Sequence, residues 1–184
     1  MRSLLLVLVL GSVQFLCSQE QTILPKEVQI ATALIPVPEG DKETTTVYGY
    51  SSKGELVVLR EGTNNLICLC DDPKVEGISV ACYSKELEPF MKRGRELTLE
   101  GKNTKEKREI QGAEVSAGKW QMPLAPSMMY VYYGSEDAYD KQTGELSDGQ
   151  YRYVIYTPFA TAKSTGLPTK PHEKGMPWLM DPGT

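Results

Sequence analysis

The spacing of apolar residues changes several times along the chain, and each change marks a predicted element. Stretches rich in Thr, Val and Tyr with alternating apolar positions predict strands, because successive side chains of a strand point to opposite faces. The predicted strands are 44–50, 55–60, 66–71, 77–83, 128–133 and 150–157. Turn residues separate the members of the first two pairs, and a long polar loop separates the third pair. We therefore expect three hairpins.

Three other stretches place apolar residues three or four positions apart, which predicts helices. They are 25–35, 89–101 and 103–117. The start of the second helix is open: it begins either near Ser84 or with Pro89 in its first turn, where the missing N–H of proline costs nothing. Asn103 and Glu106 have the spacing of a capping box at the start of the third helix.

The order of these elements predicts the fold class. Strands in hairpin succession with helices grouped between them indicate an α+β domain. We expect an antiparallel sheet of about six strands with the helices packed on one face. The predicted apolar faces of the first and third helices are Val28, Ala31 and Ile35, and Ile110, Ala113 and Ala117.

Residues 158–184 form a proline-rich tail after the domain body, residues 19–157. The prolines include Pro168, Pro171, Pro177 and Pro182, and between them lie Met176, Trp178, Leu179 and Met180. An apolar cluster between prolines predicts an irregular tail that packs on the body rather than a free linker.

The first eighteen residues have the composition of a secretory signal peptide. A single Arg2 precedes the aliphatic run 4–10, and small residues follow up to Ser18. The apolar run is far shorter than the ~20 residues that span a bilayer. We expect cleavage after Ser18 and a secreted or periplasmic location. Lipid attachment at Cys17 is the alternative.

The charge of the chain changes the list of possible partners. It has 20 basic and 24 acidic residues, a net charge of −4, with the two signs scattered. Such a chain has no basic surface for nucleic acid or anionic membrane. No further apolar run is long enough to cross a bilayer, so we expect a soluble domain without a transmembrane segment.

Export to an oxidising compartment favours a disulfide over free thiols on paired strands. Centring the second hairpin on Val75 places Cys68 opposite Cys82, close enough for a bridge. Shifting the register by one pair places Cys70 opposite Cys82 instead. The spacing favours Cys68–Cys82, with Cys70–Cys82 and the absence of a bridge as alternatives.

The same cysteines and the only histidine, His172, are the obvious metal-ligating or nucleophilic set. Their spacing matches no zinc pattern, and nothing in the sequence brings a thiol and His172 together. The acidic loop 136–148 lacks the alternating acidic pattern of a compact calcium site. No nucleophile elbow and no glycine-rich phosphate loop occurs. We therefore predict no catalytic residue, no metal and no cofactor.

The most prominent binding candidate is a set of tyrosines on the last two strands. Tyr130 and Tyr132 share one strand face, and Tyr151 and Tyr153 share one on the expected partner strand. Such a ladder can stack on a sugar or another flat ligand, although cross-strand packing is the simpler interpretation. The weak ligand-binding candidates are Tyr130, Tyr132, Tyr151, Tyr153, His172 and Trp178.

Three stretches carry a resemblance to a known family. They are Arg60-Glu61-Gly62-Thr63-Asn64 running on to Pro73, 81–97, and 164–178 with its Met176-Pro177-Trp178. In these stretches the chain resembles a family of uncharacterised exported bacterial proteins. The resemblance implies export, and it implies no activity, cofactor or catalytic residue. We expect the relatives to continue a little beyond Thr184.

Three functional hypotheses follow. The first is a non-catalytic exported protein that binds a small molecule or an envelope protein. The second is an extracytoplasmic hydrolase whose site is assembled around His172. The third is a structural domain that docks in an envelope assembly, and an exposed apolar patch at 176–180 would favour it.

Overall fold

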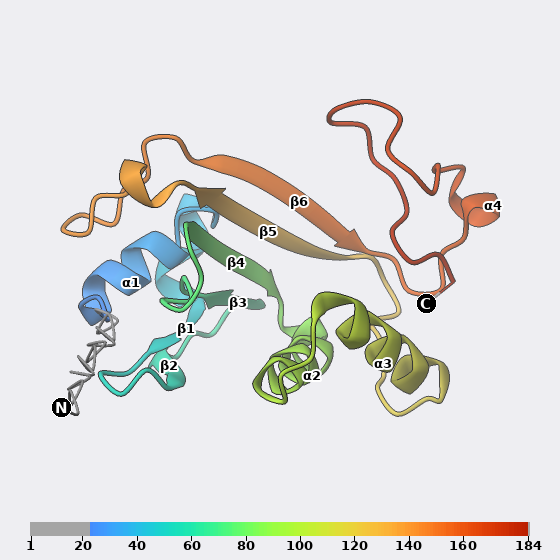
Figure 1. Cartoon of the computed structure of the whole chain (residues 1–184), viewed down its shortest axis with the longest axis horizontal. Coiled ribbons are helices and arrows are strands. Elements are labelled where there is room, and N and C mark those ends of the chain that lie inside the picture. The colour runs from blue at the N-terminus through green and yellow to red at the C-terminus, as the bar shows by residue number, and fades with distance from the viewer. Residues whose placement is uncertain (1–22, 184) are drawn as a thin grey trace, which may run out of the picture.

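The computed structural model describes residues 23–183, so the predicted signal peptide, its cleavage site and Cys17 lie outside the described residues. The strands are β1 (Thr46–Tyr50), β2 (Leu56–Arg60), β3 (Leu66–Leu69), β4 (Ile78–Ser84), β5 (Ser127–Gly134) and β6 (Gln150–Tyr156). The α-helices are α1 (Lys26–Ala33), α2 (Glu88–Leu99), α3 (Thr104–Ser116) and α4 (Ala162–Thr165). Short 3₁₀ turns are η1 (Glu39–Thr44), η2 (Lys85–Leu87) and η3 (Glu136–Ala138). The predicted α+β class is confirmed (Figure 1).

All six strands form one sheet in the order β2-β1-β3-β4-β5-β6. The three predicted hairpins are present as the antiparallel pairs β1–β2, β3–β4 and β5–β6. However, β1 and β3 are parallel. The sheet is therefore mixed, and the expectation of a wholly antiparallel sheet is wrong at this one pair.

The parallel pair arises where the chain leaves β2 and crosses the start of β1. The N–H groups of Thr63 and Asn64 donate to the Thr44 carbonyl at 2.7 and 3.0 Å. The Gly62 N–H donates to the Thr46 hydroxyl at 3.1 Å. Residues 61–65 thus pass over the start of β1, and β3 begins on the other side of that strand. Residues 61–65 have the composition of a turn, but in the structure they form a crossover connection between β2 and β3.

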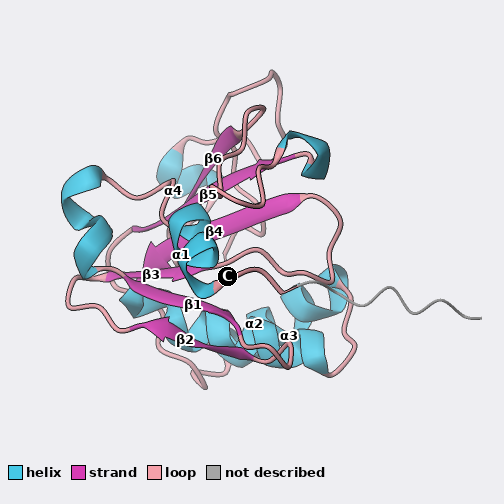
Figure 2. Ribbon diagram, turned by 90° about the vertical axis from the view of Figure 1, so that its left-hand side faces the viewer, coloured by secondary structure: helices cyan, strands magenta, loops and turns pink. Residues whose placement is uncertain are grey.

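Helices lie on both faces of the sheet, which differs from the expected single face. Cys68 and Cys82 belong to a buried cluster with Ala33 of α1. Their strand neighbours Ile67 and Tyr83 pack instead with Leu87 and Met91, at the start of α2. Because adjacent residues of a strand point to opposite faces, α1 and α2 cover opposite sides of the sheet. Figure 2 shows α1 against β3 and β4, apart from α2 and α3.

The buried face of α1 also differs from the predicted one. Its buried residues are Gln29, Thr32 and Ala33. The Gln29 amide donates to the carbonyls of Leu24 (2.8 Å) and Tyr50 (3.0 Å) and accepts from the Tyr50 N–H at 2.8 Å. A polar side chain is stable inside when its hydrogen bonds are made. Gln29 therefore joins α1 to the end of β1.

The other two long helices begin as their sequences indicate. Pro89 lies in the first turn of α2, as in the second of the two alternatives. The Asn103 side chain accepts from the N–H groups of Lys105 and Glu106, and the capping box is complete. A capped N-terminus supplies partners for backbone donors that have none within the helix.

The predicted apolar stripe of α3 is wrong. Ala113 and Ala117 are exposed, and the buried residues are Gln111 and Val115. The Gln111 amide donates to the Phe90 carbonyl of α2 at 2.8 Å. A satisfied amide, rather than an alanine stripe, joins the two helices.

The tail stands beyond the end of β6 (Figure 1). The Gly183 N–H donates to the Ala160 carbonyl at 2.7 Å, so the two ends of the tail meet. Within residues 158–183, Leu179 is the one buried residue. An ion pair of 3.8 Å between Arg108 and Asp181 connects the tail to α3.

Among residues 23–183, no helix has both the length and the apolar character that crossing a membrane requires.

Candidate functional site

The structure brings the four predicted tyrosines together on one face of β5 and β6. Tyr130 lies opposite Tyr153, and Tyr132 lies opposite Tyr151. The ring centroids are 6.0 Å apart in the first pair and 4.8 Å apart in the second. We call these four residues the tyrosine face.

The two tyrosines of β5 are the inner members of this face. Tyr132 is buried, and its hydroxyl donates to the Leu146 carbonyl at 3.1 Å. Its phenol ring lies so close to Gly149 that a Cβ there would overlap it. Tyr130 packs against the buried cluster around the disulfide. Both rings are therefore fixed by the body of the protein.

The two tyrosines of β6 are the outer members, and they face solvent. Tyr151 is 49% exposed and Tyr153 is 59% exposed. Their ring planes differ by 8°, with centroids 6.0 Å apart. Ile155, on the same face of the strand, is 58% exposed. We call Tyr151, Tyr153 and Ile155 the β6 strip, a row of exposed apolar side chains along one strand.

The opposite face of the same two strands is different. Tyr133 is 37% exposed, and the Arg152 guanidinium lies 6.0 Å from its ring centroid. Tyr156 packs edge-on against Phe90 of α2, with centroids 5.8 Å apart. Part of this face is thus covered and part carries charge, so the exposed apolar row belongs to the tyrosine face alone.

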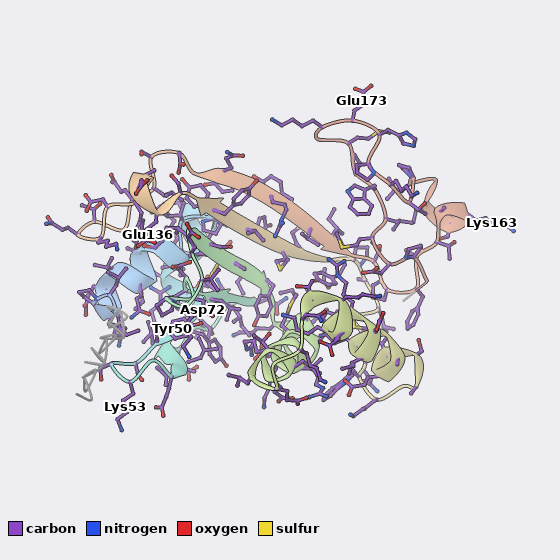
Figure 3. The ribbon with its side chains drawn as sticks, viewed as in Figure 1. Tyr50, Lys53, Asp72, Glu136, Lys163 and Glu173 are labelled. Carbon is purple, nitrogen blue, oxygen red and sulfur yellow. A yellow bond between two sulfur atoms is a disulfide. The ribbon has the colours of Figure 1, made fainter. Side chains whose placement is uncertain are left out.

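The remaining ligand-binding candidates, His172 and Trp178, lie in the tail. Both are exposed, and within residues 23–183 His172 makes no hydrogen bond or ion pair. Figure 3 shows Glu173, the neighbour of His172, at the tip of the tail, away from β5 and β6. The structure therefore does not bring His172 to a thiol or to the tyrosine face.

The cysteines are arranged as the favoured pairing predicts. Cys68 and Cys82 lie opposite each other and are joined by a disulfide. Cys70 is a buried free thiol that donates to the Gln29 carbonyl at 3.2 Å. Burial, with a smaller contribution from the Asp71 charge, raises the pKa of Cys70 to about 12. A thiol with this pKa supplies no thiolate nucleophile at neutral pH.

Sequence reasoning missed a polar cluster that forms where β3 and β4 meet the loop after β5. Asp71 accepts from the Ser79 N–H at 2.8 Å. Burial raises the pKa of Asp71 to about 6, and the charges of Asp72 and Glu136 add to this effect. Burial and then the charge of Asp72 raise the pKa of Tyr50, and the two residues lie close together in Figure 3. The alternation of strand faces stops at Leu69, so it gave no signal for these contacts.

Beside this cluster is a shallow hollow of ≈ 490 Å³. It is lined by Glu76, Gly77, Ser135, Glu136, Asp137 and Lys141. The Lys141 ammonium pairs with Glu136 at 2.8 Å. Throughout the described part of the chain, no three His, Cys, Asp or Glu side chains converge as metal ligands. The hollow is an acidic depression in the surface.

Comparison of the chain with models of protein families, with curated proteins and with solved structures finds no match in any of the three. The fold and the site together define an α+β protein with an exposed aromatic row on an edge strand of its sheet.

Proposed function

We propose that the chain is an exported, non-catalytic protein that binds a flat, ring-bearing ligand, such as a sugar, on the tyrosine face. The observation that carries the proposal is the half-exposed, nearly parallel pair of rings of Tyr151 and Tyr153 beside Ile155. Apolar side chains that are exposed in a row mark interaction sites. Aromatic rings offer a large contact area for stacking.

The inner tyrosines support this proposal because they hold the outer rings in place. Tyr153 packs edge-on against Tyr130, with ring planes at 87°, and Tyr151 packs against Tyr132. Tyr132 is itself fixed by its hydrogen bond to Leu146. A surface that is ordered before binding loses less conformational entropy when the ligand arrives.

The disulfide supports the exported part of the proposal. Cross-links such as Cys68–Cys82 persist in oxidising compartments and are rare in reducing ones. The composition of the first eighteen residues points to the same destination.

The hydrolase hypothesis receives no such support. His172 is exposed and has no acidic partner within residues 23–183, and the Cys70 thiol is buried with a pKa of about 12. A general base must itself lie within hydrogen-bonding reach of the group whose proton it removes.

A docking role is a second candidate, favoured by the tail. Met176, Trp178 and Met180 are all exposed there. Large apolar side chains gathered on one exposed segment are typical of a surface that another protein covers.

The test of ligand binding uses soluble oligosaccharides derived from chitin and from glucans as probes, observed by saturation-transfer NMR and titration calorimetry. We expect Tyr151→Ala and Tyr153→Ala each to weaken binding about 10-fold, because each removes one stacking ring. The matched control is Tyr133→Ala, an exposed tyrosine of the opposite face.

Equal affinities for the wild type and both β6 variants would contradict the proposal, as would the absence of binding to every oligosaccharide. Circular dichroism of each variant establishes that the comparison is made between folded proteins.

A further inference from the structure

The outer edge of β6 has no neighbour. In the sheet order β6 is the last strand, and no strand of residues 23–183 pairs with its outer side. It is seven residues long, contains no proline and carries a single charge, Arg152. Edge strands are commonly protected by charges, prolines or short length, and an unprotected edge is a template for another strand. The opposite edge strand, β2, has only five residues and an irregular register with β1.

We propose that two copies of this chain pair through β6, antiparallel about a two-fold axis at Tyr153, so that one sheet continues across both copies. The proposal rests on the proposed function in one respect, since the same strip that takes the ligand lies at the dimer axis. Its other arguments come from the strand sequence and from the charges at the two ends of β6.

The sequence of β6 is complementary to itself in this register. Tyr153 lies opposite its own copy, and Tyr151 lies opposite Ile155 of the second copy. Aromatic–aromatic and aromatic–β-branched pairs are favourable across antiparallel strands. Arg152 lies opposite Val154 of the second copy, so the only charge of the strand does not meet itself.

The segments that flank β6 have opposite charge. The loop before the strand, 135–149, contains one lysine and five acids, namely Glu136, Asp137, Asp140, Glu145 and Asp148. The tail after the strand contains three lysines, Lys163, Lys170 and Lys174, and two acids, Glu173 and Asp181, which gives a net charge of +1. Glu136 and Lys163 lie at opposite ends of the molecule (Figure 3). In an antiparallel pair, the start of each strand lies beside the end of the other, which brings each acidic loop beside the other tail.

Several of these charges lack a partner within one copy. Within residues 23–183, none of the three tail lysines makes an ion pair, and neither do Asp137 and Glu145. Charges of opposite sign across an interface fix the relative orientation of the partners and suppress other arrangements. The flanks therefore favour the antiparallel arrangement over a parallel one.

The dimer extends the ligand surface. Tyr130 and Tyr153 of one copy continue into Tyr153 and Tyr130 of the other, as one row across four strands. A ligand with several rings then contacts tyrosines of both copies, and its affinity for the dimer exceeds its affinity for one face alone.

The mass of the purified protein in solution, from sedimentation equilibrium over a range of concentrations, tests the pairing. We expect a dimer for the wild type and a dissociation constant raised at least ~10-fold by Tyr153→Glu, which places two like charges at the axis. An equimolar mixture of Tyr153→Glu and Tyr153→Lys restores a heterodimer. Tyr133→Glu, on the opposite face, keeps the wild-type mass.

Cysteine cross-linking tests the register. Under mild oxidation, we expect Tyr153→Cys to link to its own copy. Tyr151→Cys links poorly to itself but efficiently to Ile155→Cys in a mixture of the two variants. The parent protein is the control, because the one free thiol among residues 23–183, Cys70, is buried.

A wild type that is monomeric at every concentration overturns the inference, as does a dimer that Tyr153→Glu leaves intact. Recovery of the protein in a stoichiometric complex with a different chain, paired along β6, also overturns it. If the protein is monomeric and its oligosaccharide binding depends on Tyr151, the dimer is rejected and the proposed function is retained. If the protein forms a dimer of the proposed register but binds no oligosaccharide, the proposed function is rejected and the dimer is retained.

Discussion

Asp71 is an acidic side chain in surroundings that disfavour its charge. It lies just past the end of β3, where its carboxylate accepts one backbone N–H from Ser79. Burial raises its pKa from 3.8 to about 6, and Asp72 and Glu136 are acidic neighbours. The folded state therefore holds a proton on Asp71 in a pH range where the unfolded chain has released it.

The difference in proton binding at Asp71 makes the free energy of unfolding depend on pH. Between about pH 4 and pH 6 the folded state binds more protons at Asp71 than the unfolded state, so the free energy of unfolding falls as pH rises through that window. Asp71→Asn removes the ionisation and keeps an acceptor for Ser79. We expect the variant to be more stable than the wild type by about 1 kcal/mol at pH 7.5, a value reduced for partial solvent exposure, and by less at pH 4.5.

Urea unfolding of both proteins at the two pH values measures the effect. The matched control is Asp137→Asn, an exposed acid of the loop before β6, for which we expect little change. A stability difference between Asp71→Asn and the wild type that is the same at both pH values would show that the carboxyl is not the titrating group.

At this scale the sequence predicted the positions of side chains that follow strand alternation. The face shared by Tyr130 and Tyr132, the face shared by Tyr151 and Tyr153, and the favoured Cys68–Cys82 bridge follow from a period of two and a hairpin register. The pairing of Tyr130 with Tyr153 and of Tyr132 with Tyr151 came from the structure. The buried polar residues Gln29, Thr32 and Gln111 were not predictable in this way. Their burial depends on distant partners, such as the Tyr139 hydroxyl that lies 2.6 Å from the Thr32 hydroxyl.

Among the elements, the crossover between β2 and β3 explains one of the distinctive motifs of the chain. The Arg60 guanidinium donates to the carbonyls of Thr45 and Lys42. The Asn64 amide donates to the Asp41 carbonyl at 3.0 Å and to the Thr45 hydroxyl at 2.8 Å. The stretch 60–64 therefore fastens η1 and the start of β1 to the crossover, which is a structural role.

Gly62 lies at the tightest point of this crossover. A Cβ at this position would lie 2.3 Å from the Thr44 carbonyl oxygen and 2.3 Å from the Thr46 nitrogen, both of them backbone atoms. We expect Gly62→Ala to lower the free energy of unfolding by at least about 2 kcal/mol, because the backbone of β1 must move.

Thermal and urea unfolding check this expectation. Gly40→Ala is the control, since nothing lies within 4 Å of a Cβ there. If the two variants unfold alike, the close approach at Gly62 is not a constraint on the fold.

Local sequence is sufficient to predict the pairing of strands that are consecutive along the chain. Each hairpin was predictable because its two strands are neighbours along the chain, separated by turn residues in the first two pairs and by a long polar loop in the third. The parallel β1–β3 pair was not, because the direction in which residues 61–65 leave β2 depends on hydrogen bonds to Thr44 and Thr46.

For the whole molecule, the disulfide lies at the centre of the sheet. It joins β3 to β4, the two middle strands, and so links β2, β1 and β3 to β4, β5 and β6. Both cysteines are fully buried. The link therefore holds together the two halves of the sheet.

Replacing both Cys68 and Cys82 by alanine removes the cross-link. With a sequence separation of 14 between the bonded positions, we expect the free energy of unfolding to fall by about 3 kcal/mol, because the unfolded chain gains conformational entropy. Cys70→Ala is the matched control, and it keeps the bridge.

Urea unfolding gives the difference, and peptide mapping after alkylation identifies the bridge. In the native state we expect the Cys70 thiol to resist alkylation, and to react once the chain is unfolded without reductant. A wild type in which Cys68 reacts in its place would mean that Cys70 and Cys82 are bonded.

The overall class followed from the order of strands and helices, since that order leaves few ways to bury the apolar faces. Which strand remains at an open edge did not follow from it. The position of β1 between β2 and β3 makes β2 one edge strand, and the pairing of β5 with β4 leaves β6 at the other edge.

The Cys70 thiol, two residues from the bonded Cys68, has a consequence for how the protein reaches its native state. In an unstructured chain, rings closed from Cys82 to Cys68 or to Cys70 differ so little in size that their entropic costs are nearly equal. Air oxidation from denaturant should yield a mixture of isomers. Oxidation after the β3–β4 hairpin has formed yields one product, because Cys82 then faces Cys68 alone. Correct maturation requires the β3–β4 hairpin to form before the cysteines are oxidised, or a disulfide isomerase to convert the mixture of isomers to the Cys68–Cys82 form.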